Sequence, residues 1–107
     1  MRLSLIMMLL VAASSVSAED LAIQVCSLQA HANMNSAYLR PCDTWTSRNG
    51  CSSGSYVAWN MSEFQGASMY STSLAALVSG LTVVIRLDGQ SCLGSYDEIT
   101  MVRIVKQ

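Results

Sequence analysis

The sequence is poor in charge, has a single histidine and lacks any closely spaced pair of cysteines. Charged residues make up 12% of the chain, and six Lys or Arg against seven Asp or Glu leave a net charge of −1. A nucleic-acid or anionic-membrane partner would need a basic patch, so neither is expected. Zinc ligands occur at short spacing, so one histidine and no Cys-x-x-Cys pair predict no bound metal and no cofactor.

Residues that could carry catalysis are equally few. His31 is the sole imidazole, lies in a polar, asparagine-rich stretch and has no acidic residue near it in sequence. No Gly-x-Ser-x-Gly motif is present to expose a serine as a nucleophile. Asp97 and Glu98 are adjacent carboxylates, but neighbours on a strand point to opposite faces and are poorly placed to share a substrate. We therefore expect a protein that is not an enzyme.

Residues 1–18 have the pattern of a secretory signal peptide. Arg2 gives a positive start, residues 3–11 are apolar except for one serine, and small residues end at Ala18 before the acidic Glu19. The apolar run is shorter than the roughly 20 residues of a spanning helix, so no stable membrane insertion is expected. Cleavage between Ala18 and Glu19 would export residues 19–107 as a single domain, either to the periplasm or out of the cell.

The cysteines all follow the signal sequence: Cys26, Cys42, Cys51 and Cys92. An even number in a short exported chain is typical of disulfides, here two. Sequence alone permits three connectivities. We favour Cys26–Cys42, which would close a hairpin, with Cys51–Cys92, which would join the entries of two neighbouring strands. The alternative is Cys42–Cys51 with Cys26–Cys92.

Five segments have the composition of β-strands. Apolar and polar residues alternate in the first segment, and β-branched residues are frequent in the fourth. The segments span residues 21–30, 37–42, 56–61, 81–87 and 98–105. Pro41 cannot donate to a ladder, so the second strand should lie at an edge or end there. Apolar residues on both faces of the last strand indicate a central position in the sheet.

One helix is expected before the fourth strand, at about residues 63–79. Ser62 and Gln65 have the spacing of a capping box, although Gly66 weakens the first turn and would favour a later start. Gly80 is placed to end the helix in the left-handed conformation. The apolar face should consist of Ala67, Tyr70, Leu74, Leu77 and Val78. The order β-β-β-α-β-β predicts an α+β fold, either a small antiparallel sheet or a barrel.

The middle of the chain resembles a loose group of small exported bacterial proteins with no assigned activity. The shared pattern is Cys51, Tyr56-Val57-Ala58-Trp59, Met69-Tyr70-Ser71, Leu74-Ala75-Ala76, Ser79-Gly80 and Cys92. This resemblance covers about half of residues 19–107 and assigns no site residue. In the order of its elements alone, the chain is also similar to the pentameric, receptor-binding B subunits of bacterial toxins. That similarity implies an OB-like barrel and permits an oligomer.

The longest irregular stretch, residues 43–55, is the candidate binding surface. It is flanked by cysteines and displays Arg48 and Trp45, which looks like the most exposed aromatic ring. Tryptophan and arginine are enriched among the residues that anchor binding. The alternative is an ordinary loop whose tryptophan folds back onto the barrel. We expect a non-enzymatic binding module for an unknown protein or glycan, with a periplasmic or secreted inhibitor of a protease or lysozyme-type hydrolase as the alternative.

Overall fold

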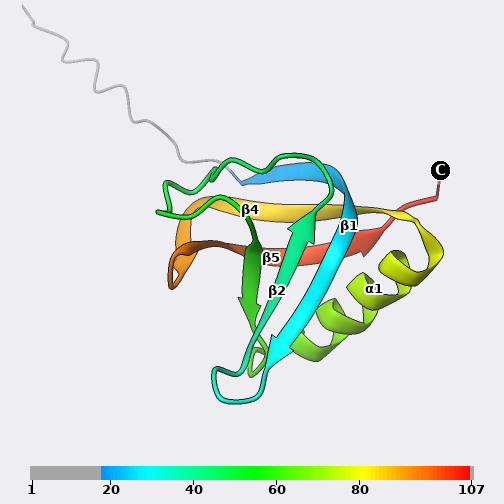
Figure 1. Cartoon of the computed structure of the whole chain (residues 1–107), viewed down its shortest axis with the longest axis horizontal. Helices are drawn as coiled ribbons and strands as arrows, with labels where there is room; N and C mark the ends of the chain where they lie inside the picture. Colours follow the sequence, from blue (N-terminus) through cyan, green and yellow to red (C-terminus); the bar gives the residue numbers. More distant parts are fainter. Residues whose placement is uncertain (1–17, 107) are drawn as a thin grey trace, which may run out of the picture.

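The computed structural model describes residues 18–106, which form five strands and one helix (Figure 1). The α+β class and the order of elements along the chain are as expected. The elements are β1 (Glu19–His31), β2 (Ser36–Pro41), β3 (Val57–Asn60), α1 (Gly66–Ser79), β4 (Thr82–Leu93) and β5 (Tyr96–Ile104). The expected signal peptide, except for its last residue, lies outside the described residues.

The strands form a closed barrel. Around it they lie in the order β1-β2-β3-β5-β4, and β4 pairs with β1 to complete the ring. The order in space therefore differs from the order in the chain. A purely antiparallel sheet is the wrong alternative, because β3 and β5 run parallel where Val57 faces Asp97 and Ala58 faces Glu98. The last strand has a neighbour on each side, which agrees with its two apolar faces.

Strand β1 is longer than its sequence pattern predicts and contributes to both sides of the barrel. Its first half, from Glu19 to Gln24, pairs with β4, and its second half pairs with β2. The register with β2 shifts between Val25 and Ser27, as at a β-bulge, which bends a strand (Figure 1). Pro41 ends β2, as expected, but the edge position is wrong because barrel closure pairs β2 on both sides.

Side chains of alternating residues fill the barrel. On β4, Val83, Ile85 and Leu87 are fully buried whereas Arg86 is exposed, which is the two-residue period of a half-buried strand. The same core includes Leu39, Val57, Trp59, Met69 and Ile99. The indole N–H of Trp59 donates to the carbonyl oxygen of Gly66 at 2.9 Å. The largest core side chain therefore also attaches the barrel to the first residue of the helix.

Helix α1 begins at Gly66, later than the capping box predicts. Gln65 occupies the N-cap without a side-chain hydrogen bond, and the Ser62 hydroxyl instead donates to Asn60 Oδ1. Gly66 is required at the start because a Cβ there would lie 2.6 Å from the carbonyl oxygen of Asn60. At the other end, Gly80 has φ +68° and ends the helix in the left-handed conformation, as expected.

The buried face of α1 is not the predicted one. Leu74 and Val78 are 44% and 79% exposed, Ala67 also points outward, and Tyr70 and Leu77 are half-buried. The barrel instead contacts residues at 3 and 4 spacing that are mostly small: Gly66, Met69, Ser73 and Ala76. Small side chains on the inner stripe let the helix approach β1 and β5 closely, because interiors pack without gaps.

Helix α1 carries no charged side chain. Ser73 is fully buried, but its hydroxyl donates to the carbonyl oxygen of Met69 at 2.7 Å, so its burial costs little. Among residues 18–106, no helix is both long enough and apolar enough to span a membrane.

Two disulfides join the described residues. Cys26 in β1 is bonded to Cys42, directly after β2, with Cα atoms 4.8 Å apart. Cys51 in the following loop is bonded to Cys92 in β4, with Cα atoms 5.9 Å apart. These are the pairs favoured from the sequence. The reason given for the second pair holds only in part, because β3 and β5 are neighbours in the barrel but Cys92 lies near the end of β4 and not at the entry to β5.

Candidate functional site

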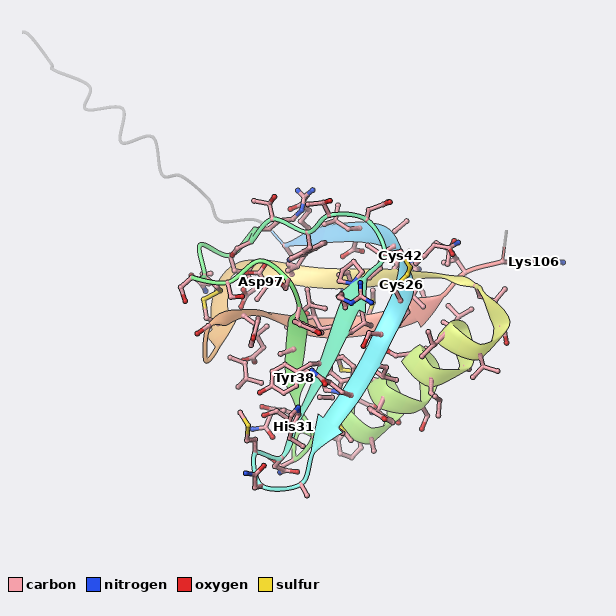
Figure 2. The ribbon with its side chains drawn as sticks, viewed as in Figure 1. Cys26, His31, Tyr38, Cys42, Asp97 and Lys106 are labelled. Carbon is pink, nitrogen blue, oxygen red and sulfur yellow. A yellow bond between two sulfur atoms is a disulfide. The ribbon has the colours of Figure 1, made fainter. Side chains whose placement is uncertain are left out.

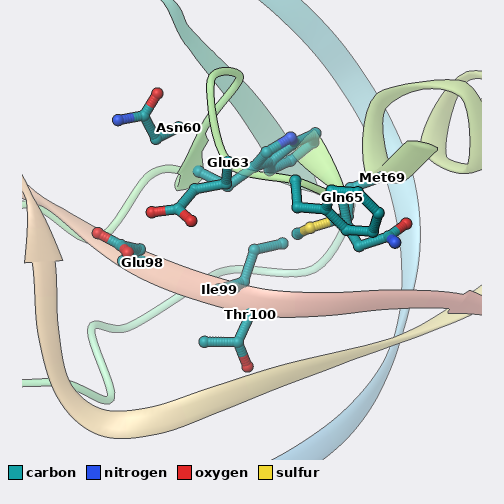
Figure 3. Close-up of a pocket in the computed structure, with 9 residues that line it drawn as sticks. Asn60, Glu63, Gln65, Met69, Glu98, Ile99 and Thr100 are labelled. Atoms are coloured by element: carbon teal, nitrogen blue, oxygen red, sulfur yellow. The ribbon is translucent and has the colours of Figure 1, made fainter. Parts of the chain in front are cut away.

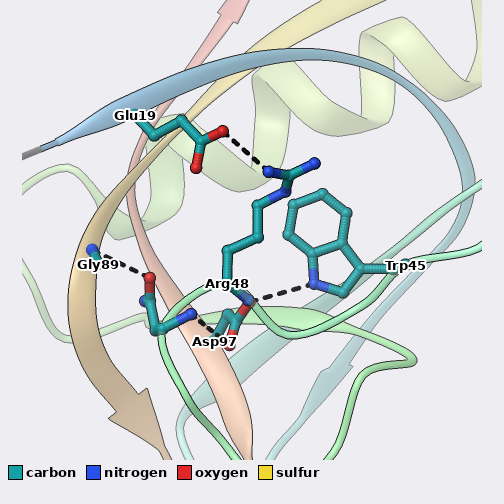
Figure 4. A network of polar contacts seen from close by, with 6 residues as sticks. Glu19, Trp45, Arg48, Gly89 and Asp97 are labelled. Carbon is teal, nitrogen blue, oxygen red and sulfur yellow. Dashed lines mark hydrogen bonds and ion pairs between the residues drawn. The ribbon is translucent and has the colours of Figure 1, made fainter.

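The loop between β2 and β3 is held by one buried carboxylate. Asp97, near the start of β5, is fully buried and accepts four hydrogen bonds from this loop. Figure 4 shows it beside Trp45 and Arg48. The donors are the Trp45 indole N–H (3.2 Å), the Ser47 hydroxyl (2.5 Å), and the backbone N–H groups of Arg48 (2.7 Å) and Asn49 (3.4 Å). An ionised carboxylate has about four acceptor sites, so these bonds use its full capacity.

Trp45 and Arg48, the predicted surface residues, are both engaged within the fold. Trp45 is half-buried and packs against the barrel core, so it is not the most exposed aromatic ring; Phe64 is 94% exposed. The Arg48 guanidinium lies over the indole, with Cζ 5.7 Å from the ring centroid, and pairs with Glu19 at 2.9 Å (Figure 4). The tryptophan thus folds back onto the barrel, and the arginine covers it.

Asn49 connects three segments at the same end of the barrel. Its side-chain N–H group donates to the carbonyl oxygens of Ser91 (2.7 Å) and Glu98 (3.3 Å), and its oxygen accepts the N–H of Gly89 (3.0 Å). Gly89 has φ +85°, a conformation that favours glycine. With the Cys51–Cys92 bridge beside it, this end of the barrel is braced by side chains as well as by the sheet.

The outer wall of the barrel carries a row of aromatic rings. We call this row the aromatic strip; in spatial order it consists of His31, Tyr38, Tyr96 and Tyr56. Successive rings meet edge to face, with centroids 5.3, 5.5 and 5.7 Å apart, a separation at which such pairs attract. Tyr96 directly precedes the buried Asp97, and adjacent strand residues point to opposite faces, which places the strip outside.

A shallow hollow of about 220 Å³ adjoins the strip. It is lined by Gln29, His31, Met34, Tyr38 and Tyr96. Gln29 and Tyr38 are directly paired in the β1–β2 ladder, so their side chains share one face of the sheet. Figure 2 shows His31 at the end of β1 and Tyr38 on β2 beside it. The lining holds no Asp, Glu, Lys or Arg side chain.

A larger hollow, of about 320 Å³, lies between β5 and the connection from β3 to α1 (Figure 3). Its apolar side is formed by Trp59, Met69 and Ile99. Its acidic residues are Glu63 and Glu98. Burial raises the pKa of Glu98, and the negative charges of Glu63 and Asp88 raise it further. The two carboxyl groups, with no lysine or arginine in the lining, make this hollow unfavourable for an anion.

Groups that could support catalysis or metal binding are dispersed. His31 contacts the ring of Tyr38. Asp97 and Glu98 point to opposite faces, as predicted, with Asp97 beneath the loop and Glu98 at the larger hollow. In the part of the chain that the structure describes, no three His, Cys, Asp or Glu side chains gather as ligands for a metal ion.

The sequence reasoning missed both the aromatic strip and the role of Asp97. The sequence contains part of the information needed to predict the hollow. Gln29 and His31 are two positions apart on one strand, so their side chains share a face. The register between strands is absent from such a pattern, and it is the register that brings Tyr38 against Tyr96. Neither a protein-family model nor a curated protein matches the sequence.

Proposed function

We propose that the protein is an exported, non-enzymatic binding module that recognises a glycan or a protein surface. The observation that carries this proposal is the aromatic strip with its adjoining hollow. Tyrosine offers a large, amphipathic contact area at a low cost in conformational entropy, and it is enriched where proteins bind partners. Of its four rings, that of His31 is exposed, those of Tyr56 and Tyr96 are half-buried, and that of Tyr38 is buried.

The barrel is proposed to be OB-like. Two observations support this proposal. The strands close in the order β1-β2-β3-β5-β4 with a helix between β3 and β4. The order of elements is also similar to that of toxin B subunits. Likeness of fold does not carry function, so the binding proposal depends on the strip and not on the barrel. Export is supported by the two disulfides, which persist in oxidising compartments, and by the pattern of residues 1–18.

A binding screen of the oxidised protein against immobilised glycans and purified extracellular proteins tests the function. Saturable, reversible binding without formation of a product is expected. Tyr96→Ala should abolish it, because Tyr96 contacts both Tyr38 and Tyr56 in the strip. Arg48→Ala, at the braced loop, is the control that should bind normally. Turnover of the bound ligand, or no saturable binding to either class, would contradict the proposal.

A second candidate, inhibition of a protease or lysozyme-type hydrolase, is favoured by the geometry of the Trp45 and Arg48 loop. Its bonds to Asp97 fix the loop before any partner arrives, and a preorganised loop loses little entropy on binding. The Arg48 side chain is 46% exposed and therefore accessible to an enzyme. Inhibition by the parent protein but not by Arg48→Ala would support this candidate. A hydrolase panel that shows no inhibition at micromolar protein would remove it.

A further inference from the structure

The hollow beside the aromatic strip is lined by residues whose polar groups form no hydrogen bond in the described part of the chain. They are the Gln29 amide, the His31 imidazole and the hydroxyls of Tyr38 and Tyr96. Within residues 18–106, none of these groups makes a side-chain hydrogen bond. They come from β1, β2 and the start of β5, and the barrel brings them together around one opening.

Tyr38 is the most informative of these residues. It is only 6% exposed, and its ring lies between those of His31 and Tyr96. No buried side-chain polar atom of the described residues lacks a partner, so the Tyr38 hydroxyl, which makes no hydrogen bond there, is not fully buried. Tyr38 is also one of the residues that line the hollow. A buried ring with an open hydroxyl is held in position before a ligand arrives, which lowers the entropy cost of binding.

The lining selects against charged and purely apolar ligands. An anion would find no lysine or arginine among the five lining residues, and a cation would find no carboxylate. A purely apolar ligand would displace water from the polar groups and leave them unpaired, which is unfavourable. The ligand that fits has an apolar face for the Tyr96 ring and several hydroxyls for the polar groups. A sugar ring has both.

The size of the hollow limits the ligand further. Pockets for drug-sized ligands occupy roughly 300–1,000 Å³. The hollow here, at about 220 Å³, is smaller and has room for one ring rather than for several. A longer glycan would therefore place one residue in the hollow and extend away from it.

We infer that this hollow binds one neutral sugar residue, with its apolar face against the half-buried ring of Tyr96 and its hydroxyls bonded to Tyr38 and Gln29. The inference rests on the proposed binding function and narrows its ligand to a neutral glycan at one place. A single sugar in an open hollow should bind with a Kd on the order of millimolar.

The experiment is an NMR titration of the oxidised protein with methyl glycosides of glucose, galactose, mannose and N-acetylglucosamine. N-acetylneuraminic acid serves as the charged comparator. At least one neutral glycoside should shift the side-chain signals of Gln29, His31 and Tyr38, and the charged sugar should bind more weakly than that glycoside. Equal or tighter binding of the charged sugar would contradict the uncharged lining.

Two matched variants locate the site. Tyr38→Phe removes the hydroxyl but keeps the buried ring, so Kd for the glycoside should rise roughly fivefold, the value of one lost hydrogen bond. Tyr56→Phe makes the same change in the same strip, but Tyr56 does not line the hollow. Its Kd should stay within about twofold of the parent value. Equal effects of the two substitutions, or no effect of Tyr38→Phe, would overturn the inference.

Failure of the inference can be told apart from failure of the proposed function. If no neutral glycoside shifts these signals at up to about 100 mM, the sugar assignment is wrong. If a protein ligand from the binding screen shifts them instead, the binding module stands and the sugar does not. Sugar binding that shifts only the Trp45 and Arg48 loop would overturn the hollow as the site. A screen without any ligand would remove both proposals.

Discussion

The carboxylate of Asp97 accepts the indole N–H of Trp45 at 3.2 Å, a contact between residues 52 positions apart in the chain. A buried carboxylate is costly unless its acceptor sites are filled. Here Ser47 and the backbone N–H groups of Arg48 and Asn49 fill the remainder. The irregular loop after β2 therefore depends for its shape on a single side chain of β5.

Replacing that carboxylate tests this dependence. Asp97→Asn would turn an NH₂ group toward donors of the loop and leave buried groups unpaired, at a cost of about 2–4 kcal/mol in the free energy of unfolding. Urea unfolding under oxidising conditions measures the change. Asp43→Asn, an exposed carboxylate of the same loop, is the control and should change stability by less than about 0.5 kcal/mol. Similar losses in both variants would contradict the account.

The two disulfides should differ in their contribution to stability. The chain-entropy estimate is about 3 kcal/mol for the 16-residue separation of Cys26 and Cys42 and about 4 kcal/mol for the 41-residue separation of Cys51 and Cys92. Serine pairs at each bridge, compared by thermal unfolding, should therefore show the larger loss for the second bridge. A larger loss for the first bridge would mean that native-state strain or residual structure outweighs loop closure.

The corrected face of α1 gives a matched pair of substitutions. Ala76→Leu adds volume at a position that is 1% exposed and should destabilise the fold by about 1–3 kcal/mol through overpacking. Val78→Leu introduces the same residue at a position that is 79% exposed, and it should change stability by less than about 0.5 kcal/mol. Chemical unfolding of both variants checks the assignment. The reverse order would restore the face predicted from the sequence.

Stability should depend on pH through Glu98. Its pKa is raised by burial and by the charges of Glu63 and Asp88, so the folded state holds this proton more tightly than the unfolded state. The resulting stabilisation is present below the pKa of the unfolded chain and is lost as pH rises through the folded-state pKa. Glu98→Gln should therefore be more stable than the parent protein at neutral pH, and the gain should shrink in acid.

Urea unfolding at several pH values measures this gain. The size of the effect should be modest, because Glu98 is only partly buried and solvent screens its charge. The control is Asp43→Asn, whose carboxylate is exposed, and its stability should run parallel to that of the parent protein. A Glu98→Gln variant that is less stable than the parent at neutral pH would contradict the pKa direction.

The order of elements was readable from local patterns. Gly80 stops the helix in the left-handed conformation as predicted, because this choice depends on backbone sterics within one turn. The sequence pattern predicts the wrong buried face of the helix, for a physical reason. Leu74 and Val78 are apolar and correctly spaced, but a neighbouring stripe of smaller residues fits the barrel more closely. Hydrophobicity alone therefore does not predict which of the two helix stripes packs against the barrel.

Other features depend on contacts between distant segments. Pro41 marks the end of β2 in the sequence, but nothing local indicates that a closed barrel leaves no edge beside it. Trp45 sits in a polar loop and looks exposed until its partner Asp97 is known. The contact of Tyr38 with Tyr96 likewise requires the barrel to be closed. These relationships follow from register and closure, which short patterns do not contain.

The parallel contact of β3 with β5 has a consequence for how the chain reaches its folded state. A ribosome releases the chain from its N-terminus, so β1, β2 and β3 emerge before the segment that carries Asp97. Neither Val57 nor Ala58 can meet its β5 partner until Asp97 and Glu98 have been synthesised, and contacts of such long sequence separation form slowly. The pairing of β3 with β5, and with it the closed ring of strands, would therefore be among the last contacts to form.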